Sequence, residues 1–85
     1  MVVKKFSSPD NERMVERMVC VKLGKRIRTL RNTHNLTQEE LSARANISTK
    51  YLQNLEGKDP KAASIITIEK LAKAFGMSIS QFFRF

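Results

Sequence analysis

The chain has few of the residues from which catalytic and metal sites are usually built. Its 85 residues include one cysteine, Cys20, and one histidine, His34. A single cysteine excludes an intrachain disulfide and a zinc site built on cysteines, and it fits a reducing compartment. His34 has no cysteine or carboxylate at ligand or triad spacing, and the three glycines are too scattered to form a phosphate-binding loop. We therefore expect no enzyme, no metal site and no cofactor.

Long hydrophobic runs and acidic residues are also scarce. The stretch 1–6 lacks the apolar run of a signal peptide, and no later window resembles a membrane span. We expect a single soluble, cytoplasmic domain with no membrane partner and no evident small-molecule ligand. The 8 Asp and Glu residues are outnumbered by 16 Lys and Arg, which gives a net charge of +8. That balance favours a polyanionic partner, and nucleic acid before an anionic membrane.

The apolar spacing between residues 36 and 57 predicts two short helices that meet at a corner. Leu41 and Ala45 stand four apart, and Leu52 and Leu55 stand three apart. Ile47 lies between the two pairs, where a buried side chain can fill the corner. One straight helix would not place these five residues on a single face.

Cap and turn residues mark the ends of these two helices. Thr37 and Glu40 have the spacing of a capping box at the start of the first helix. Asn46 tolerates the left-handed backbone that the turn requires. Ser48 can cap the second helix and Gly57 can end it.

Helical periodicity continues on both sides of this corner. Ser8-Pro9-Asp10 is typical of a helix start, and a helical stripe follows it. Gly24 weakens a helix without ending it, so residues 9–21 form either a separate helix or an extension of the next one. Residues 65–75 form another stripe that Gly76 closes, and the capping-box pattern in Ser78-Ile79-Ser80-Gln81 begins a last short helix.

From Leu23 to Phe83 the chain resembles the helix-turn-helix repressors of the Cro and cI kind, the XRE family. Four features carry the resemblance: a first helix ending in a basic residue, a helix start of Leu-Thr-Gln-Glu-Glu-Leu, a recognition helix ending in Glu-Gly, and a later apolar helix. In this chain they are Ile27-Arg28-Thr29-Leu30-Arg31, Leu36-Thr37-Gln38-Glu39-Glu40-Leu41, Glu56-Gly57 and Leu71-Ala72-Lys73-Ala74. The tail from Ile65 to Arg84 also resembles the controller proteins of restriction-modification systems. Ser42, Asn46 and Thr49 depart from the usual Ala, Gly and basic residue.

The resemblance implies an all-α, compact five-helix domain of the lambda-repressor type. We expect this domain to span residues 23–85, with an N-terminal extension over residues 1–22 that is partly helical. It also implies that Arg31 and Glu56 form an ion pair that joins the first helix to the end of the recognition helix.

The recognition helix is expected over residues 49–56. If Leu52 and Leu55 face the core, four side chains can face the major groove and contact bases: Thr49, Lys50, Gln53 and Asn54. Helix starts and basic residues around it offer donors to phosphates, namely Gln38, Arg44, Ser48, Tyr51, Lys58 and Lys61. The simple alternative is a solvated side chain at each base-contact position and a solvated cation at Arg44, Lys58 and Lys61, or for Tyr51 a structural ring at the core edge.

One recognition helix reads too few base pairs for specificity, so we expect a homodimer on a palindromic operator of double-stranded DNA. A short terminal helix cannot bury three rings from one side. The dimer interface is therefore expected at the C-terminal end, from Ile65, Ile66, Ile79, Phe82, Phe83 and Phe85. In the alternative, Phe82 caps the core and Phe85 lies loose in solvent.

A homodimeric regulator of transcription is the preferred function. The alternative is an antitoxin-like interaction module that binds DNA only for autoregulation. The two differ in the role of residues 6–21. The stripe of Met14, Val15, Met18 and Val19 either covers the core, which we prefer, or binds a partner. Cys20 is interpreted as a small buried hydrophobic residue.

Overall fold

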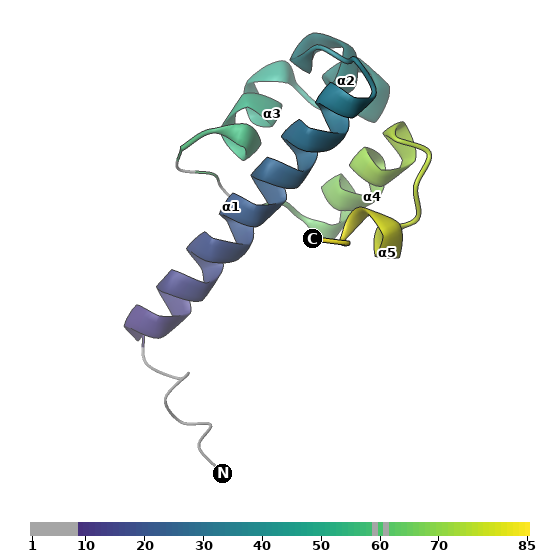
Figure 1. The fold of residues 1–85 in the computed structure, drawn as a ribbon. Helices are drawn as coiled ribbons and strands as arrows, with labels where there is room; N and C mark the ends of the chain where they lie inside the picture. Colours follow the sequence, from purple (N-terminus) through teal and green to yellow (C-terminus); the bar gives the residue numbers. More distant parts are fainter. Residues whose placement is uncertain (1–8, 59, 61) are drawn as a thin grey trace.

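The computed structural model describes residues 9–58, 60 and 62–85, which form five α-helices and no strand (Figure 1). The helices are α1 (Pro9–Thr33), α2 (Gln38–Ala45), α3 (Thr49–Glu56), α4 (Ile65–Ala74) and α5 (Ile79–Phe82). Helix α1 packs against α3, α2 packs against α3 and α4, and α4 packs against α5. The predicted all-α, five-helix fold is confirmed.

Helix α1 is one continuous helix of 25 residues, about 37 Å long. Gly24 does not interrupt it, so the first helical segment is an extension of the next one. Its C-terminal half crosses the bundle, while its N-terminal half projects beyond the other helices (Figure 1). The expected start signal includes Ser8, which lies outside the described residues. The helix runs through residue 22, where the predicted extension meets the predicted domain.

The core is built from one face of each helix, and its first member is Leu23. Its buried apolar residues are Leu23, Ile27, Leu30, Leu36, Leu41, Ala45, Leu52, Leu55, Ile68, Leu71, Ala72, Phe75 and Phe82. The corner between α2 and α3 closes over this cluster, with Ile47 packed against its edge. Burying these side chains against one another is what holds helices this short in place.

Phe82 belongs to this core, and its predicted place in a dimer interface is wrong. Its side chain is 0% exposed, and its ring stacks on that of Phe75 with 6.5 Å between centroids. The guanidinium of Arg26 in α1 donates to the carbonyls of Gln81 and Phe82, each at 2.9 Å. These bonds hold α5 on the bundle, so the first of the three clustered rings points inward and leaves no surface for a partner.

The predicted caps of the central helices are present. Thr37 Oγ1 accepts from the Glu40 amide at 3.0 Å, and the Thr37 amide donates to the Glu40 carboxylate at 2.9 Å. Hydrogen bonding by Thr37 lowers the pKa of the Glu40 carboxyl. Asn46 has φ 55° and takes the left-handed conformation at the corner. Gly57 ends α3 with φ −80°, so no left-handed backbone is needed there.

An apolar stripe on α1 was expected to cover the core, and its exposure shows that this interpretation is wrong. Met14, Val15, Met18 and Val19 are 62%, 50%, 52% and 52% exposed, so they do not cover the core of their own chain. These residues belong to the N-terminal half of α1, which projects beyond the other helices (Figure 1). Cys20, on the same segment, is half-buried rather than fully buried.

Candidate nucleic-acid interface

Helix α3, which the sequence predicts to be the recognition helix, presents one polar sector to solvent. Leu52 and Leu55 are buried, whereas Lys50, Gln53 and Asn54 are exposed. At about 100° per residue, the three exposed side chains fall within one sector of about 100°. Helix α3 is therefore held by one face and displays amide and ammonium groups on the other.

Thr49, the fourth predicted base contact, is half-buried at the start of α3. Ser42 Oγ donates to the carbonyl of Glu39 at 2.9 Å and lies 2.8 Å from Thr49 Oγ1. Because the Ser42 proton is engaged by Glu39, the Thr49 hydroxyl donates to Ser42. This bond ties α3 to α2. Helical spacing alone does not predict this bond, although a serine at a position that is usually alanine was a signal.

Arg31 and Glu56 form a two-pronged ion pair between α1 and the end of α3, the arrangement that the resemblance implied. Arg31 Nε donates to Glu56 Oε2, and Nη2 donates to Oε1, each at 3.0 Å. A third donor, Nη1, reaches the carbonyl of Leu36 at 3.0 Å. The Glu56 side chain is 1% exposed and that of Arg31 is 16% exposed. Because both side chains are buried to this extent, removing one of them would leave the charge of the other without its main partner.

Two further side chains complete the surroundings of Glu56. Gln38 Nε2, at the start of α2, donates to Glu56 Oε1 at 3.3 Å. Arg28 Nη2 donates to the Glu56 carbonyl at 2.9 Å, and Arg28 Nε lies 3.8 Å from Glu56 Oε1. Glu56 thus gathers donors from α1 and α2 around the end of α3. Gln38 was predicted to contact phosphate alone, and Arg28 was given no role, because neither contact with Glu56 follows from spacing along the chain.

The remaining predicted phosphate contacts that the structure describes lie around α2 and α3. Ser48 caps α3, and its Oγ accepts from the Tyr51 amide at 3.0 Å. Tyr51 is half-buried against the core, while Arg44 and Lys58 are exposed. Lys61 lies outside the described residues. The positive ends of α2 and α3 add free backbone N–H groups to these donors.

Within the described chain, no three His, Cys, Asp or Glu side chains gather in a group that could hold a metal ion. His34 instead packs its ring against Phe75, with 5.1 Å between centroids, and its Nδ1 lies 2.8 Å from the carbonyl of Leu30. None of the described helices has the length and apolar character to cross a bilayer.

Comparison with known proteins assigns the family. The sequence profile described as Helix-turn-helix matches residues 27–82, which include all of α2, α3, α4 and α5. The chain belongs to the helix-turn-helix family. As the resemblance implied, it is of the XRE type, a family that binds double-stranded DNA and regulates transcription rather than catalysing reactions.

Curated relatives of this helix-turn-helix protein carry names that agree with the family. The Immunity repressor protein of Bacillus phage phi105 is 38% identical over 58 residues, which are 68% of this chain and 40% of the repressor. The match therefore spans less than half of that relative. An uncharacterised HTH-type transcriptional regulator of Sinorhizobium fredii is 39% identical over 56 residues, which are 66% of this chain and 71% of the regulator.

A solved structure shares the fold. The crystal structure of the restriction-modification controller protein C.AhdI from Aeromonas hydrophila superposes with a TM-score of 0.72 at 30% identity. The superposition covers 98% of that chain but 78% of the present one. The helix-turn-helix protein described here thus carries residues that have no counterpart in the controller protein.

Proposed function

We propose that this helix-turn-helix protein is a sequence-specific, homodimeric regulator of transcription that places α3 in the major groove of double-stranded DNA. One observation carries the proposal. Lys50, Gln53 and Asn54 form a single exposed sector on a helix whose opposite face is fixed in the core. A rigid helix with polar side chains on its free face meets the geometric demand of base reading.

The side chains of this sector match base edges. Asn54 and Gln53 each carry a donor and an acceptor, which suits two-pronged hydrogen bonding to adenine. Lys50 can donate to the N7 and O6 acceptors of guanine. The hydroxyl of Thr49 is engaged by Ser42, so we assign its methyl group to contact with a thymine methyl.

Phosphate contacts would flank the exposed sector of α3. The amide groups at the starts of α2 and α3 lie beside Gln38 and Ser48, and Tyr51 presents a hydroxyl from the core edge. Arg44, Lys58 and Lys61 supply the cations. Such contacts do not distinguish one base sequence from another. They would fix the position of α3 on the duplex and make affinity depend on salt.

The dimer would form at the C-terminal end. Ile65 and Ile66 are 65% and 66% exposed, and Phe83 and Phe85 are 41% and 51% exposed. Ile79 is half-buried at their edge. Several exposed apolar side chains close together are typical of a protein–protein interface. A two-fold symmetric dimer is the arrangement that contacts two half-sites of an inverted repeat.

Selection of bound duplexes from a random pool tests the proposal. The wild type should enrich an inverted repeat whose half-sites lie about one DNA turn apart. The matched control replaces the exposed sector by alanine, Lys50→Ala, Gln53→Ala and Asn54→Ala together, which leaves the buried face of α3 intact. Failure to enrich any motif, or enrichment of the same motif by the control variant, would contradict the assignment of α3.

A further inference from the structure

One flank of α1 carries three arginines in line with the point where α3 meets it. Gly24 marks this point, because its backbone lies against the carbonyl of Leu55 at the end of α3. At about 100° per residue, Arg13, Arg17 and Arg28 all project within about 40° of the direction of Gly24. All three side chains are exposed. This arginine-bearing flank continues onto the half of α1 that projects beyond the bundle (Figure 1).

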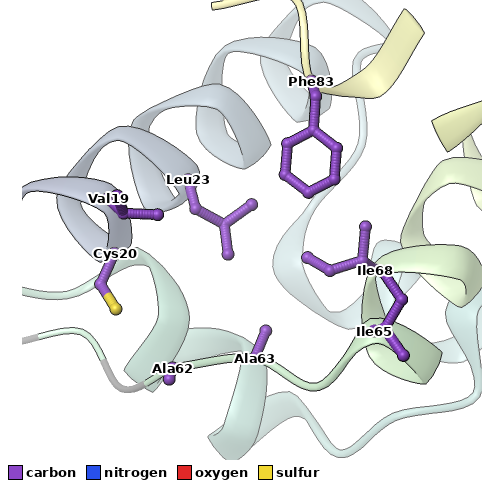
Figure 2. A pocket seen from close by; sticks show the side chains of 8 residues that line it. All are labelled: Val19, Cys20, Leu23, Ala62, Ala63, Ile65, Ile68 and Phe83. Carbon is purple, nitrogen blue, oxygen red and sulfur yellow. The ribbon is translucent and has the colours of Figure 1, made fainter. Parts of the chain in front are cut away.

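The segment that follows α3 lies along this flank. Arg13, Arg17 and Cys20 border a hollow of about 330 Å³ together with Pro60 and Ala62. Ala62 also lines the apolar groove shown in Figure 2, which Cys20 borders from α1. The described part of the connection between α3 and α4 is thus seated on α1. It joins the end of α3 and the two N-terminal arginines into one surface.

Positive charge predominates on this surface. Arg13 and Arg17 stand against Glu16, which supplies the only carboxylate at the hollow among the described residues. Lys58 is exposed just after the end of α3, two residues before Pro60, and adds a further cation. A net positive surface attracts a polyanion, and a guanidinium group pairs with two oxygens of a phosphate at once. The surface therefore has the chemistry to bind the backbone of a nucleic acid.

The spacing along α1 indicates phosphates rather than base edges. With a rise of 1.5 Å per residue, Arg17 and Arg13 lie about 10 and 16 Å from Gly24 along the helix. The major groove of DNA is about 12 Å wide. A duplex that holds α3 in this groove presents its sugar-phosphate backbone at such a distance from the groove centre.

We propose that Arg13 and Arg17 bind phosphates of the duplex beside the major groove that holds α3. The projecting half of α1 lengthens the phosphate track assigned to Lys58. The family profile begins at residue 27, so this contact is made by residues outside the helix-turn-helix match. The proposal rests on the proposed function and adds a second element to its DNA contact.

The opposite flank of α1 offers a matched control. Lys22 and Lys25 are exposed and border a groove with Phe85. They project about 160° and 100° away from the direction of Gly24. Arg13→Ala/Arg17→Ala and Lys22→Ala/Lys25→Ala each remove two of the 16 Lys and Arg residues. A general effect of net charge would therefore be the same in both variants.

The salt dependence of DNA affinity tests the proposal. The slope of log affinity against log salt should fall by about two per protomer in Arg13→Ala/Arg17→Ala, with affinity about tenfold weaker for all sequences. Lys22→Ala/Lys25→Ala should keep a slope close to that of the wild type. Arg13→Lys/Arg17→Lys retains both cations and should also keep it. An unchanged slope in the arginine-to-alanine variant, or an equal fall in the lysine control, would overturn the proposal.

Ethylation of single phosphates locates the contact on the duplex. For the wild type, ethylation should block binding at phosphates beside each half-site. One or two of these positions per half-site should become insensitive in Arg13→Ala/Arg17→Ala and stay sensitive in Lys22→Ala/Lys25→Ala. Circular dichroism checks that both variants keep the helical content of the wild type. An identical ethylation pattern for the wild type and both variants would contradict the contact.

These outcomes separate the further inference from the proposed function. A wild type that selects a motif, with a slope that does not respond to loss of Arg13 and Arg17, removes the α1 contact and leaves the assignment of α3 standing. A wild type that selects no motif contradicts the assignment of α3. The salt slope can still be measured on any duplex, so the α1 contact is tested in either case.

Discussion

Gly24 of α1 lies so close to the backbone carbonyl of Leu55 in α3 that a Cβ at this position would overlap it. Glycine in the middle of a helix costs about 1 kcal/mol relative to alanine. Here its missing side chain lets α1 and α3 approach at backbone distance, about one turn from Arg28 and two turns from Arg31, which both contact Glu56. Helix α3 is therefore positioned by a close backbone approach as well as by ion pairs.

Replacing Gly24 by alanine should destabilise the protein, although alanine is the better helix former. We expect the free energy of unfolding to fall by about 2 kcal/mol, because the neighbouring atom is backbone and cannot move aside cheaply. Chemical denaturation measures the change. Lys25→Ala, at the next and exposed position, should stay within about 0.5 kcal/mol of wild type. A more stable Gly24→Ala variant would contradict the close approach.

Removal of Arg31 should lower stability before it affects DNA binding. Arg31→Ala leaves the buried carboxylate of Glu56 with weaker partners only. We therefore expect the free energy of unfolding to fall by about 3 kcal/mol. Arg44→Ala removes an exposed cation and should melt like the wild type. If Arg31→Ala also melts like the wild type but fails to bind DNA, Arg31 is a direct DNA contact and its architectural assignment is wrong.

The clustered phenylalanines should divide into one core residue and two surface residues. Phe82→Ala should cost about 3–5 kcal/mol, because it empties a fully buried site. The double variant Phe83→Ala/Phe85→Ala should keep its helical content by circular dichroism and shift from dimer to monomer in sedimentation at micromolar concentration. A double variant that dimerises fully would move the interface away from the chain end.

Lys58 should contribute to affinity for all sequences alike. Lys58→Ala removes one cation beside α3, so it should reduce the slope of log affinity against log salt by about one. Lys61→Ala should behave in the same way. The control is Lys73→Ala, whose ammonium lies 3.9 Å from the Glu69 carboxylate in α4. A loss confined to particular base pairs would show that Lys58 reads sequence.

Much of the helical framework could be predicted because its signals are local. The capping box of Thr37 and Glu40, the left-handed Asn46 and the cap at Ser48 act within a few residues of themselves. The exposed sector of α3 followed from helical periodicity once Leu52 and Leu55 were placed inward. The partnership of Arg31 and Glu56, 25 residues apart, came from family resemblance and not from any local pattern.

The rest depended on how the helices pack. Gly24 resembles a helix breaker until its approach to Leu55 is known. Composition could show that three rings crowd the chain end, but not that Arg26 draws α5 inward and buries Phe82. The stripe on α1 looked like core because its spacing is that of core. Its exposure follows from where the bundle ends, which no local pattern records.

The central claim is that α3 reads base edges, and Asn54 tests it most directly. Affinity should be measured for wild type and Asn54→Ala on the selected site and on every single base-pair variant of it. We predict that Asn54→Ala costs about 1–3 kcal/mol on the selected site and removes discrimination at one base pair in each half-site, with preference elsewhere unchanged. An unchanged profile, or an equal loss on all sequences, would contradict a base contact by this helix.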